Sequence, residues 1–114
     1  MDTAEITRIA VAALEDIKAK DITVMDVHHL TSLFDTMIVA SGDSTRQVKA
    51  LADHVREKIK EAGGDILGTE GEQASEWVLV DAGGVIVHVM HPTARQYYNL
   101  EELWGAARKR RAGA

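Results

Sequence analysis

The chain has 114 residues, of which 46% are hydrophobic and 27% are charged, a composition typical of one ordinary globular domain. It contains no cysteine, which excludes disulfide bonds and thiolate chemistry, and no apolar run approaches the roughly 20 residues that span a bilayer. The net charge of −5 argues against broad, nonspecific binding to nucleic acids, which relies on neutralising phosphates, and favours a basic partner.

The N-terminus lacks the basic and apolar blocks of a secretion signal, so we expect a cytoplasmic protein that does not associate with membranes. Hydrophobic periodicity and β-branched content then predict, in order, a helix, a strand, a loop and a second strand, at residues 3–19, 22–27, 28–33 and 34–40. Asp2 or Thr3 is expected to cap the first helix. Ser44 and Gln47 have capping-box spacing, which predicts that a second long helix begins there and ends at Gly63.

In the second half of the chain, residues 65–75 are ambiguous, and Asp65 to Gly68 could form a short edge strand. Residues 77–90 form two apolar runs around Gly83 and Gly84, a pair that accommodates the positive φ of a tight hairpin turn. A turn is expected around residues 92–98. A last short helix should then carry apolar residues at helical spacing: Leu100, Leu103, Trp104 and Ala107.

These elements predict an α/β fold in which helices pack on a mixed sheet of four or five strands. The strand–helix–strand order in the middle of the chain indicates a crossover between the second strand and residues 77–81, to which the hairpin adds an antiparallel strand. We assign a single domain to residues 1–107. Residues 108–114 are expected to form a short basic tail.

The predicted hairpin has two faces of different composition. If the two glycines are the loop residues, Trp77 lies opposite Met90 and Leu79 lies opposite His88. One face is uniformly apolar and suits packing against helices: Val78, Val80, Ala82, Val85, Val87 and Val89. The other face, here called the mixed face, consists of Trp77, Leu79, Asp81, Ile86, His88 and Met90. Its mixture of Trp, His, Asp and Met is typical of a recognition surface.

No metal site is expected, although the chain has five histidines. His88 and His91 lie three apart on a strand, where side chains alternate with period two, so they should point to opposite faces. The adjacent His28 and His29 should diverge in the same way. Without cysteines or paired carboxylates beside these residues, a three- or four-ligand set is missing.

Catalysis and cofactor binding are also not expected. The turn from Gly42 to Ser44 opens a helix and could hold an anion. A nucleotidyltransferase would need an Asp-x-Asp pair on the next strand, where this chain offers Asp81 alone. Two alternatives stay open: an acid–base role for Asp81 with His88, and a residual nucleotidyl- or phosphotransferase that uses the Gly42–Ser44 turn with Asp81.

The C-terminal region carries an aromatic cluster and a basic cluster. Trp104 is expected to pack the final helix on the sheet, whereas at least one of Tyr97 and Tyr98 should be exposed. The basic cluster consists of Arg108, Lys109, Arg110 and Arg111. It either complements the negative end of a helix or contacts phosphates of RNA.

Three blocks of this sequence resemble the ribosomal silencing factor family, whose members are also called Iojap-related or RsfS proteins. They are Asp21-Ile-Thr-Val-Met-Asp-Val27; Ser32-Leu-Phe-Asp-Thr-Met-Ile-Val-Ala-Ser-Gly-Asp-Ser-Thr-Arg-Gln47; and Glu76-Trp-Val-Leu-Val-Asp-Ala-Gly-Gly-Val-Ile-Val-His-Val-Met-His91 with Arg95, Tyr98, Leu100 and Trp104. Because the order and spacing of all three blocks agree, the resemblance is specific.

The resemblance implies a translational repressor without enzymatic activity. Family members bind the large ribosomal subunit through the universal ribosomal protein L-fourteen and block joining of the small subunit, whereas organelle relatives act in large-subunit assembly. The family fold is related to nucleotidyltransferases but lacks the catalytic acids, and homodimers occur. By position, Trp77, Asp81, His88 and Tyr98 are family-motif residues and candidate partner contacts. Leu79 and Met90 join them only because they lie on the mixed face.

Overall fold

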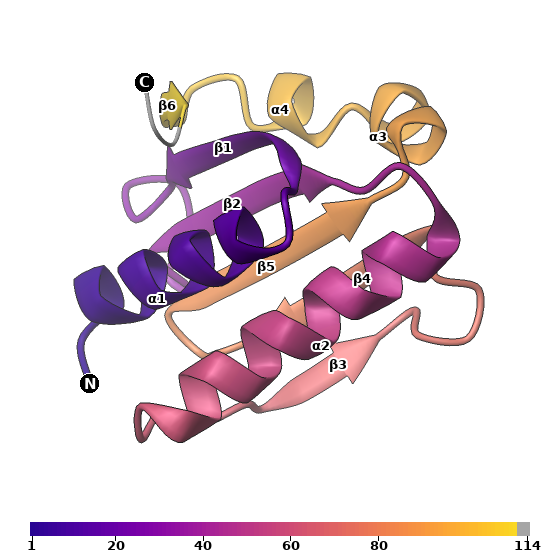
Figure 1. Ribbon diagram of the computed structural model, residues 1–114. Coiled ribbons are helices and arrows are strands. Elements are labelled where there is room, and N and C mark those ends of the chain that lie inside the picture. The colour runs from indigo at the N-terminus through magenta and orange to yellow at the C-terminus, as the bar shows by residue number, and fades with distance from the viewer. Residues whose placement is uncertain (112–114) are drawn as a thin grey trace.

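A six-stranded mixed sheet forms the centre of the computed structural model, which describes residues 1–111 (Figure 1). The helices are α1 (Thr3–Asp16), α2 (Thr45–Glu61), α3 (Pro92–Tyr98) and α4 (Leu100–Leu103). The strands are β1 (Lys20–Asp26), β2 (Thr36–Ser41), β3 (Gly68–Glu70), β4 (Trp77–Asp81), β5 (Val85–Met90) and β6 (Arg108–Arg111). Their order in the sheet is β3-β4-β5-β2-β1-β6; β2 and β5 run parallel, and the other pairs are antiparallel.

Capping residues define where the two long helices begin and end. The carboxylate of Asp2 accepts a hydrogen bond from the Glu5 N–H at 2.8 Å, so Asp2 rather than Thr3 caps α1. Ser44 Oγ accepts from the Gln47 N–H at 3.1 Å, which confirms the predicted start of α2. Just past its end, Gly63 adopts a φ of +95°, a conformation that glycine reaches without steric penalty.

Two apolar layers lie on the two faces of the sheet. Helices α1 and α2 cover one face, which Figure 1 shows toward the viewer. The predicted apolar face of the hairpin is buried there, as expected: Val78, Val80, Ala82, Val85, Val87 and Val89. The opposite face is smaller, and the C-terminal segment covers it by inserting Leu100 among Met25, Met37 and Met90. Trp104 packs against this second layer, as predicted.

The α/β prediction is confirmed, but the strand count of four or five is wrong. Residues 108–111, expected to begin a tail, form β6 and pair antiparallel with β1. Their backbone groups bond the open edge of β1, and a run of basic side chains carries no apolar periodicity that would reveal a strand. Residues 112–114 of the predicted tail lie outside the described residues.

Three further expectations differ from the structure. The segment at 92–98 is the helix α3 rather than a turn, because His91 caps it and Pro92 occupies its first position, where a missing N–H is harmless. The short edge strand β3 begins at Gly68, where the predicted one ends. The strand parallel to β2 is β5 rather than β4, so the crossover ends on the second strand of the hairpin.

Two glycines close in sequence, Gly68 in β3 and Gly71 in the loop that leads into β4, should respond differently to substitution by alanine. Gly71 has a φ of +86°, and a Cβ there would lie 2.0 Å from the carbonyl oxygen of Trp77. Gly71→Ala should therefore lower the free energy of unfolding by more than about 1 kcal/mol. Gly68→Ala meets open space and should change it by no more than about 0.5 kcal/mol. Urea denaturation of both variants tests this, and equal stabilities would contradict the close backbone approach at Gly71.

Candidate protein-docking surface

Trp77 lies at the centre of the exposed aromatic residues, where β4 meets α3. Its indole N–H donates a hydrogen bond of 2.9 Å to Nδ1 of His88 on the neighbouring strand. Its ring centroid lies 4.7 Å from that of Tyr98. Trp77 is half-buried, with part of its ring against the second apolar layer. The hydrogen bond thus fixes the ring orientation while part of the indole stays accessible.

His88 lies beneath Trp77 and is only 5% exposed. Because an indole N–H can only donate, Nδ1 of His88 must hold a lone pair and the ring must be neutral. Burial lowers the pKa of His88 from about 6.5 to about 4, since the charged form loses its hydration. Protonation at Nδ1 would remove the acceptor that positions Trp77.

Two tyrosines extend the surface beyond Trp77. Tyr97 is 80% and Tyr98 53% exposed, and their rings meet edge to face at 5.0 Å. The prediction that at least one tyrosine is exposed is confirmed. Trp77, Tyr97 and Tyr98 are here called the aromatic platform. Beside the platform lies an open pocket of about 480 Å³, lined by Thr45, Glu76, His91, Thr93, Ala94, Tyr97 and Tyr98.

Arg95 fastens the platform to the sheet. From α3 its guanidinium donates to Glu101 Oε1 at 2.8 Å, to Ser41 Oγ at 2.9 Å and to Thr23 Oγ1 at 3.2 Å. The hydrogen bond from Arg95 holds the pKa of Glu101 below its usual range. The Arg95 side chain is 13% exposed, which leaves it little room to contact a partner. Sequence analysis identified Arg95 only as part of a motif, because its hydrogen bonds reach residues 54 and 72 positions away.

The predicted mixed face has the expected register but is unevenly exposed. Trp77 pairs with Met90 and Leu79 with His88, as predicted. Leu79 and Asp81 are half-buried, whereas His88 is nearly covered and Met90 is fully buried. Met90 therefore belongs to the apolar layer beneath the surface rather than to its accessible part.

Asp81 and His88 have separate partners. Asp81 Oδ1 accepts from the Gly83 N–H at 2.8 Å and so stabilises the hairpin turn, while His88 serves Trp77. The two lie on different strands, with Ile86 opposite Asp81. The contact of Asp81 with the hairpin turn and that of His88 with Trp77 therefore explain where the two side chains lie.

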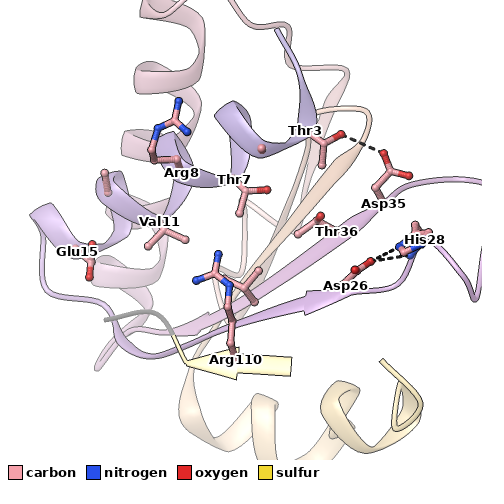
Figure 2. Close-up of a pocket in the computed structure, with 13 residues that line it drawn as sticks. Thr3, Thr7, Arg8, Val11, Glu15, Asp26, His28, Asp35, Thr36 and Arg110 are labelled. Carbon is pink, nitrogen blue, oxygen red and sulfur yellow. Dashed lines mark hydrogen bonds and ion pairs between the residues drawn. The ribbon is translucent and has the colours of Figure 1, made fainter. Parts of the chain in front are cut away.

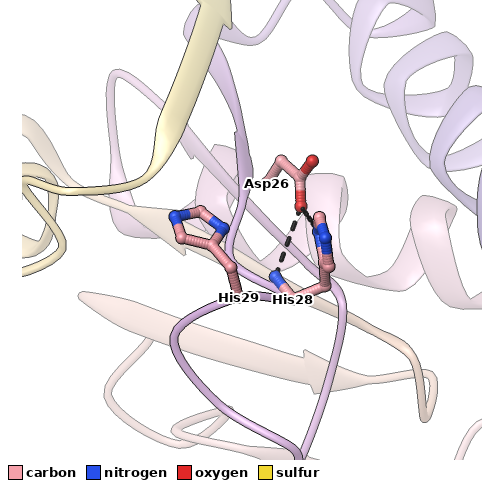
Figure 3. Close-up of side chains that lie close together, drawn as sticks. All are labelled: Asp26, His28 and His29. Atoms are coloured by element: carbon pink, nitrogen blue, oxygen red, sulfur yellow. Dashed lines mark hydrogen bonds and ion pairs between the residues drawn. The ribbon is translucent and has the colours of Figure 1, made fainter.

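The histidines near the end of β1 differ from the prediction. His28 and His29 do not diverge: their rings lie 5.5 Å apart, and Asp26 joins them in one cluster (Figure 3). The expectation assumed the alternation of a strand, but β1 ends at Asp26 and both histidines lie in a turn. Period-two alternation does not apply to turn residues.

The basic cluster lies on the edge strand β6, which the strands β5, β2 and β1 separate from β4, where Trp77 lies. Arg108, Lys109 and Arg110 are exposed. Lys109 Nζ donates to the backbone oxygen of Glu101 at 2.8 Å, and Arg110 lines a groove beside α1 (Figure 2). The fourth member, Arg111, pairs with Thr23 through its backbone position in β6. Within residues 1–111, no helix is long and apolar enough to cross a membrane.

Comparison with known proteins decides the family. The model of the family described as "Ribosomal silencing factor during starvation" matches residues 1–113. The chain belongs to the ribosomal silencing factor family. The Chromobacterium violaceum "Ribosomal silencing factor RsfS" is 62% identical over 105 residues, which cover 92% of this chain and 86% of that protein.

Two other similarities extend the comparison within the ribosomal silencing factor family. A crystal structure of a protein from Chromobacterium violaceum matches with a TM-score of 0.91 and 58% identity, covering 100% of this chain and 95% of the other. The mouse "Mitochondrial assembly of ribosomal large subunit protein 1" is 32% identical over 97 residues, which are 82% of this chain and 42% of that protein. The α/β fold is therefore that of a solved relative.

The buried His88 predicts a pH dependence of stability. Its pKa in the folded protein is below that of the unfolded chain, so the unfolded chain binds more protons between about pH 6.5 and about pH 4. The stability that neutral His88 contributes is complete above this window and is lost as the pH falls through it, to a total of about 3 kcal/mol. His88→Asn keeps an acceptor near the Nδ1 position but does not titrate.

Denaturant unfolding of both proteins at several pH values measures this contribution. The wild-type protein should lose more stability than His88→Asn on acidification, because carboxylates titrate in both proteins. Parallel curves would show that His88 does not titrate as described.

Proposed function

We propose that this protein represses translation in the cytoplasm by binding the large ribosomal subunit through ribosomal protein L-fourteen and sterically blocking the small subunit. The exposed aromatic platform is the observation that carries the proposal. Family membership supports the ribosomal role, and the sequence resemblance supports the choice of L-fourteen and the mechanism.

The platform has the physical features of a binding hot spot. Trp and Tyr dominate protein interfaces because they bury a large area with few rotatable bonds. Tyr97 and Tyr98 expose most of their rings, and Trp77 is oriented by His88 before any partner arrives. A preorganised ring loses little conformational entropy on binding. The pocket between the tyrosines and Glu76 offers a place for a partner side chain.

Charge supports a basic partner for the platform. The net charge of −5 favours encounter with a positively charged ribosomal protein. Glu76 is exposed at the pocket beside Tyr97 and Tyr98, where it can pair with a lysine or arginine. Long-range attraction would then raise the rate of association, while the aromatic rings supply the short-range binding energy.

A steric mechanism requires no catalytic activity from the chain. The Gly42–Ser44 turn serves as the cap of α2, and Asp81 serves the hairpin turn. These contacts give the turn and Asp81 a structural role and provide no reason to assign them nucleotidyl or phosphoryl transfer, the alternative activity of these residues. Calorimetric titration with ATP or CTP and Mg²⁺ distinguishes the two: nucleotide binding that is lost in Asp81→Asn would favour an enzyme.

A role in large-subunit assembly is the second candidate function. The name of the mouse relative refers to assembly of the mitochondrial ribosomal large subunit. Sedimentation of separated subunits with added protein discriminates the candidates. A repressor reduces the formation of whole ribosomes from finished subunits, whereas a pure assembly factor leaves their joining unchanged. Sedimentation of the free protein shows whether it is a monomer or a homodimer.

Substitutions in the platform should weaken binding to purified large subunits. Trp77→Ala should cost at least about 2 kcal/mol of binding free energy, close to a thirtyfold rise in Kd. Tyr98→Ala should cost about 1 kcal/mol, and because Tyr98 is exposed the substitution should leave the fold intact. Leu67→Ala, at another exposed apolar residue outside the platform, is the control. Undiminished binding by folded Trp77→Ala and Tyr98→Ala would place the docking surface elsewhere.

Ribosomal RNA contact by β6 makes a separate prediction. Arg108 and Arg110 are exposed, and each phosphate contact releases about one counterion. The double variant Arg108→Gln and Arg110→Gln should therefore reduce the slope of log K against log salt by about 1–2. Lys18→Gln with Lys60→Gln removes the same charge from exposed positions elsewhere. Equal slopes for both double variants would show that β6 does not contact RNA.

A further inference from the structure

We propose that Asp26, His28 and His29 form a binding site for one divalent transition-metal ion of the Zn²⁺ or Ni²⁺ class. The site lies where β1 ends and the following turn begins, within four residues of the chain (Figure 3). It is independent of the aromatic platform, and nothing in the proposed ribosomal function requires it.

The geometry brings three ligand atoms to one place. One ligand atom from each residue lies within 4.8 Å of the others. His28 Nδ1 and Asp26 Oδ1 are 2.5 Å apart in a hydrogen bond. Tetrahedral ligands about 2.1 Å from a zinc ion lie about 3.4 Å from one another. Both histidines are exposed, so small rotations of their rings suffice to reach this spacing.

A hydrogen bond outside the cluster already selects the tautomer that a metal needs. His29 Nε2 lies 3.1 Å from the carbonyl oxygen of Ala106. A carbonyl only accepts, so Nε2 carries the proton and Nδ1 is left with its lone pair. Metal-binding histidines commonly donate their second N–H to a carbonyl in this way, which fixes the ring.

Asp26 is prepared to act as an anionic ligand. The His28 ring and the His28 backbone N–H, at 3.3 Å, both bond its Oδ1. A bound ion would replace the hydrogen bond between Asp26 and His28 as the contact that joins the two side chains.

The ligand types select the class of ion. Two imidazoles and one carboxylate suit Zn²⁺, Ni²⁺, Co²⁺ and Cu²⁺, whereas Ca²⁺ and Mg²⁺ prefer sites made of oxygen atoms alone. Three protein ligands leave at least one coordination position for water or a small ligand. Asp26 and His28 also line the groove of about 870 Å³ beside α1, so the ion would lie at the edge of this groove (Figure 2).

Calorimetric titration of the full chain, prepared without a histidine tag, tests the site with ZnCl₂ and NiCl₂. The wild-type protein should bind one equivalent. Each of His28→Ala, His29→Ala and Asp26→Asn should weaken binding at least about tenfold, as loss of one ligand in three predicts. With Co²⁺, the wild-type protein should show the visible absorption of a nitrogen-ligated ion, and the three ligand variants should not.

His54→Ala is the matched control. His54 Nε2 lies 3.0 Å from Asp16 Oδ2, so it forms a similar histidine–carboxylate pair, but it is not part of a three-residue cluster in the described chain. This variant should bind the metal as the wild type does. Equal affinities for His28→Ala, His29→Ala and the wild type would overturn the proposal, as would several weak equivalents. Circular dichroism of each variant excludes unfolding as the cause of lost binding.

Discussion

Burial of both faces of the central strands is the constraint on which the structure depends. Strands β2 and β5 are parallel neighbours, and nearly every residue in them is buried. Such strands need cover on each side, because an exposed apolar face would remain in contact with water. Helices α1 and α2 supply complete cover on one face. The other face depends on two short helices of seven and four residues, which contribute one buried apolar side chain, Leu100.

Incomplete cover on this second face explains where the aromatic platform lies. Trp77 packs against the layer that contains Met90, and it remains half-buried. Tyr98 then covers part of Trp77 from the end of α3. The sheet thus has a small apolar layer whose outer surface is aromatic, which is the composition expected where a partner completes the cover.

The short helices α3 and α4 stay on the second face of the sheet because polar contacts compensate for the small apolar area that they bury. Arg95 bonds three side chains from two strands and α4, and most of its guanidinium is shielded from water. Charge-assisted hydrogen bonds of this kind are stronger and more directional than neutral ones. His88 plays the same part under Trp77, because its lone pair satisfies the indole N–H. Both residues set the geometry of the platform from below.

The sequence predicted those features that depend on local pattern. The capping of α2 by Ser44, the hairpin register and the apolar face toward the helices follow from spacing within a few residues. Strand order did not follow, because the choice of β5 over β4 as the neighbour of β2 depends on packing across the whole sheet. The strand β6 was missed because its partner edge, rather than its composition, makes it a strand.

Within the candidate site, the sequence identified Trp77 and Tyr98 from residue type but could not assign depth. Met90 and His88 belong to the same sheet face as Trp77, yet Met90 is buried in the layer that contains Leu100, and His88 is only 5% exposed beneath Trp77. Alternation specifies the side of a strand, and only the tertiary structure specifies what lies over it. The proximity of His28 and His29 was missed because the alternation of strand residues was applied to two residues that lie in a turn.

The loop after β1 connects the proposed metal site to the cover of the second face. Phe34 packs on Trp104 with ring centroids 5.8 Å apart, and His29 bonds the carbonyl of Ala106. Both contacts join the loop to the segment that follows α4. An ion bound by His29 would add a further restraint on the loop at one end of these contacts, without any chemical step at the ion.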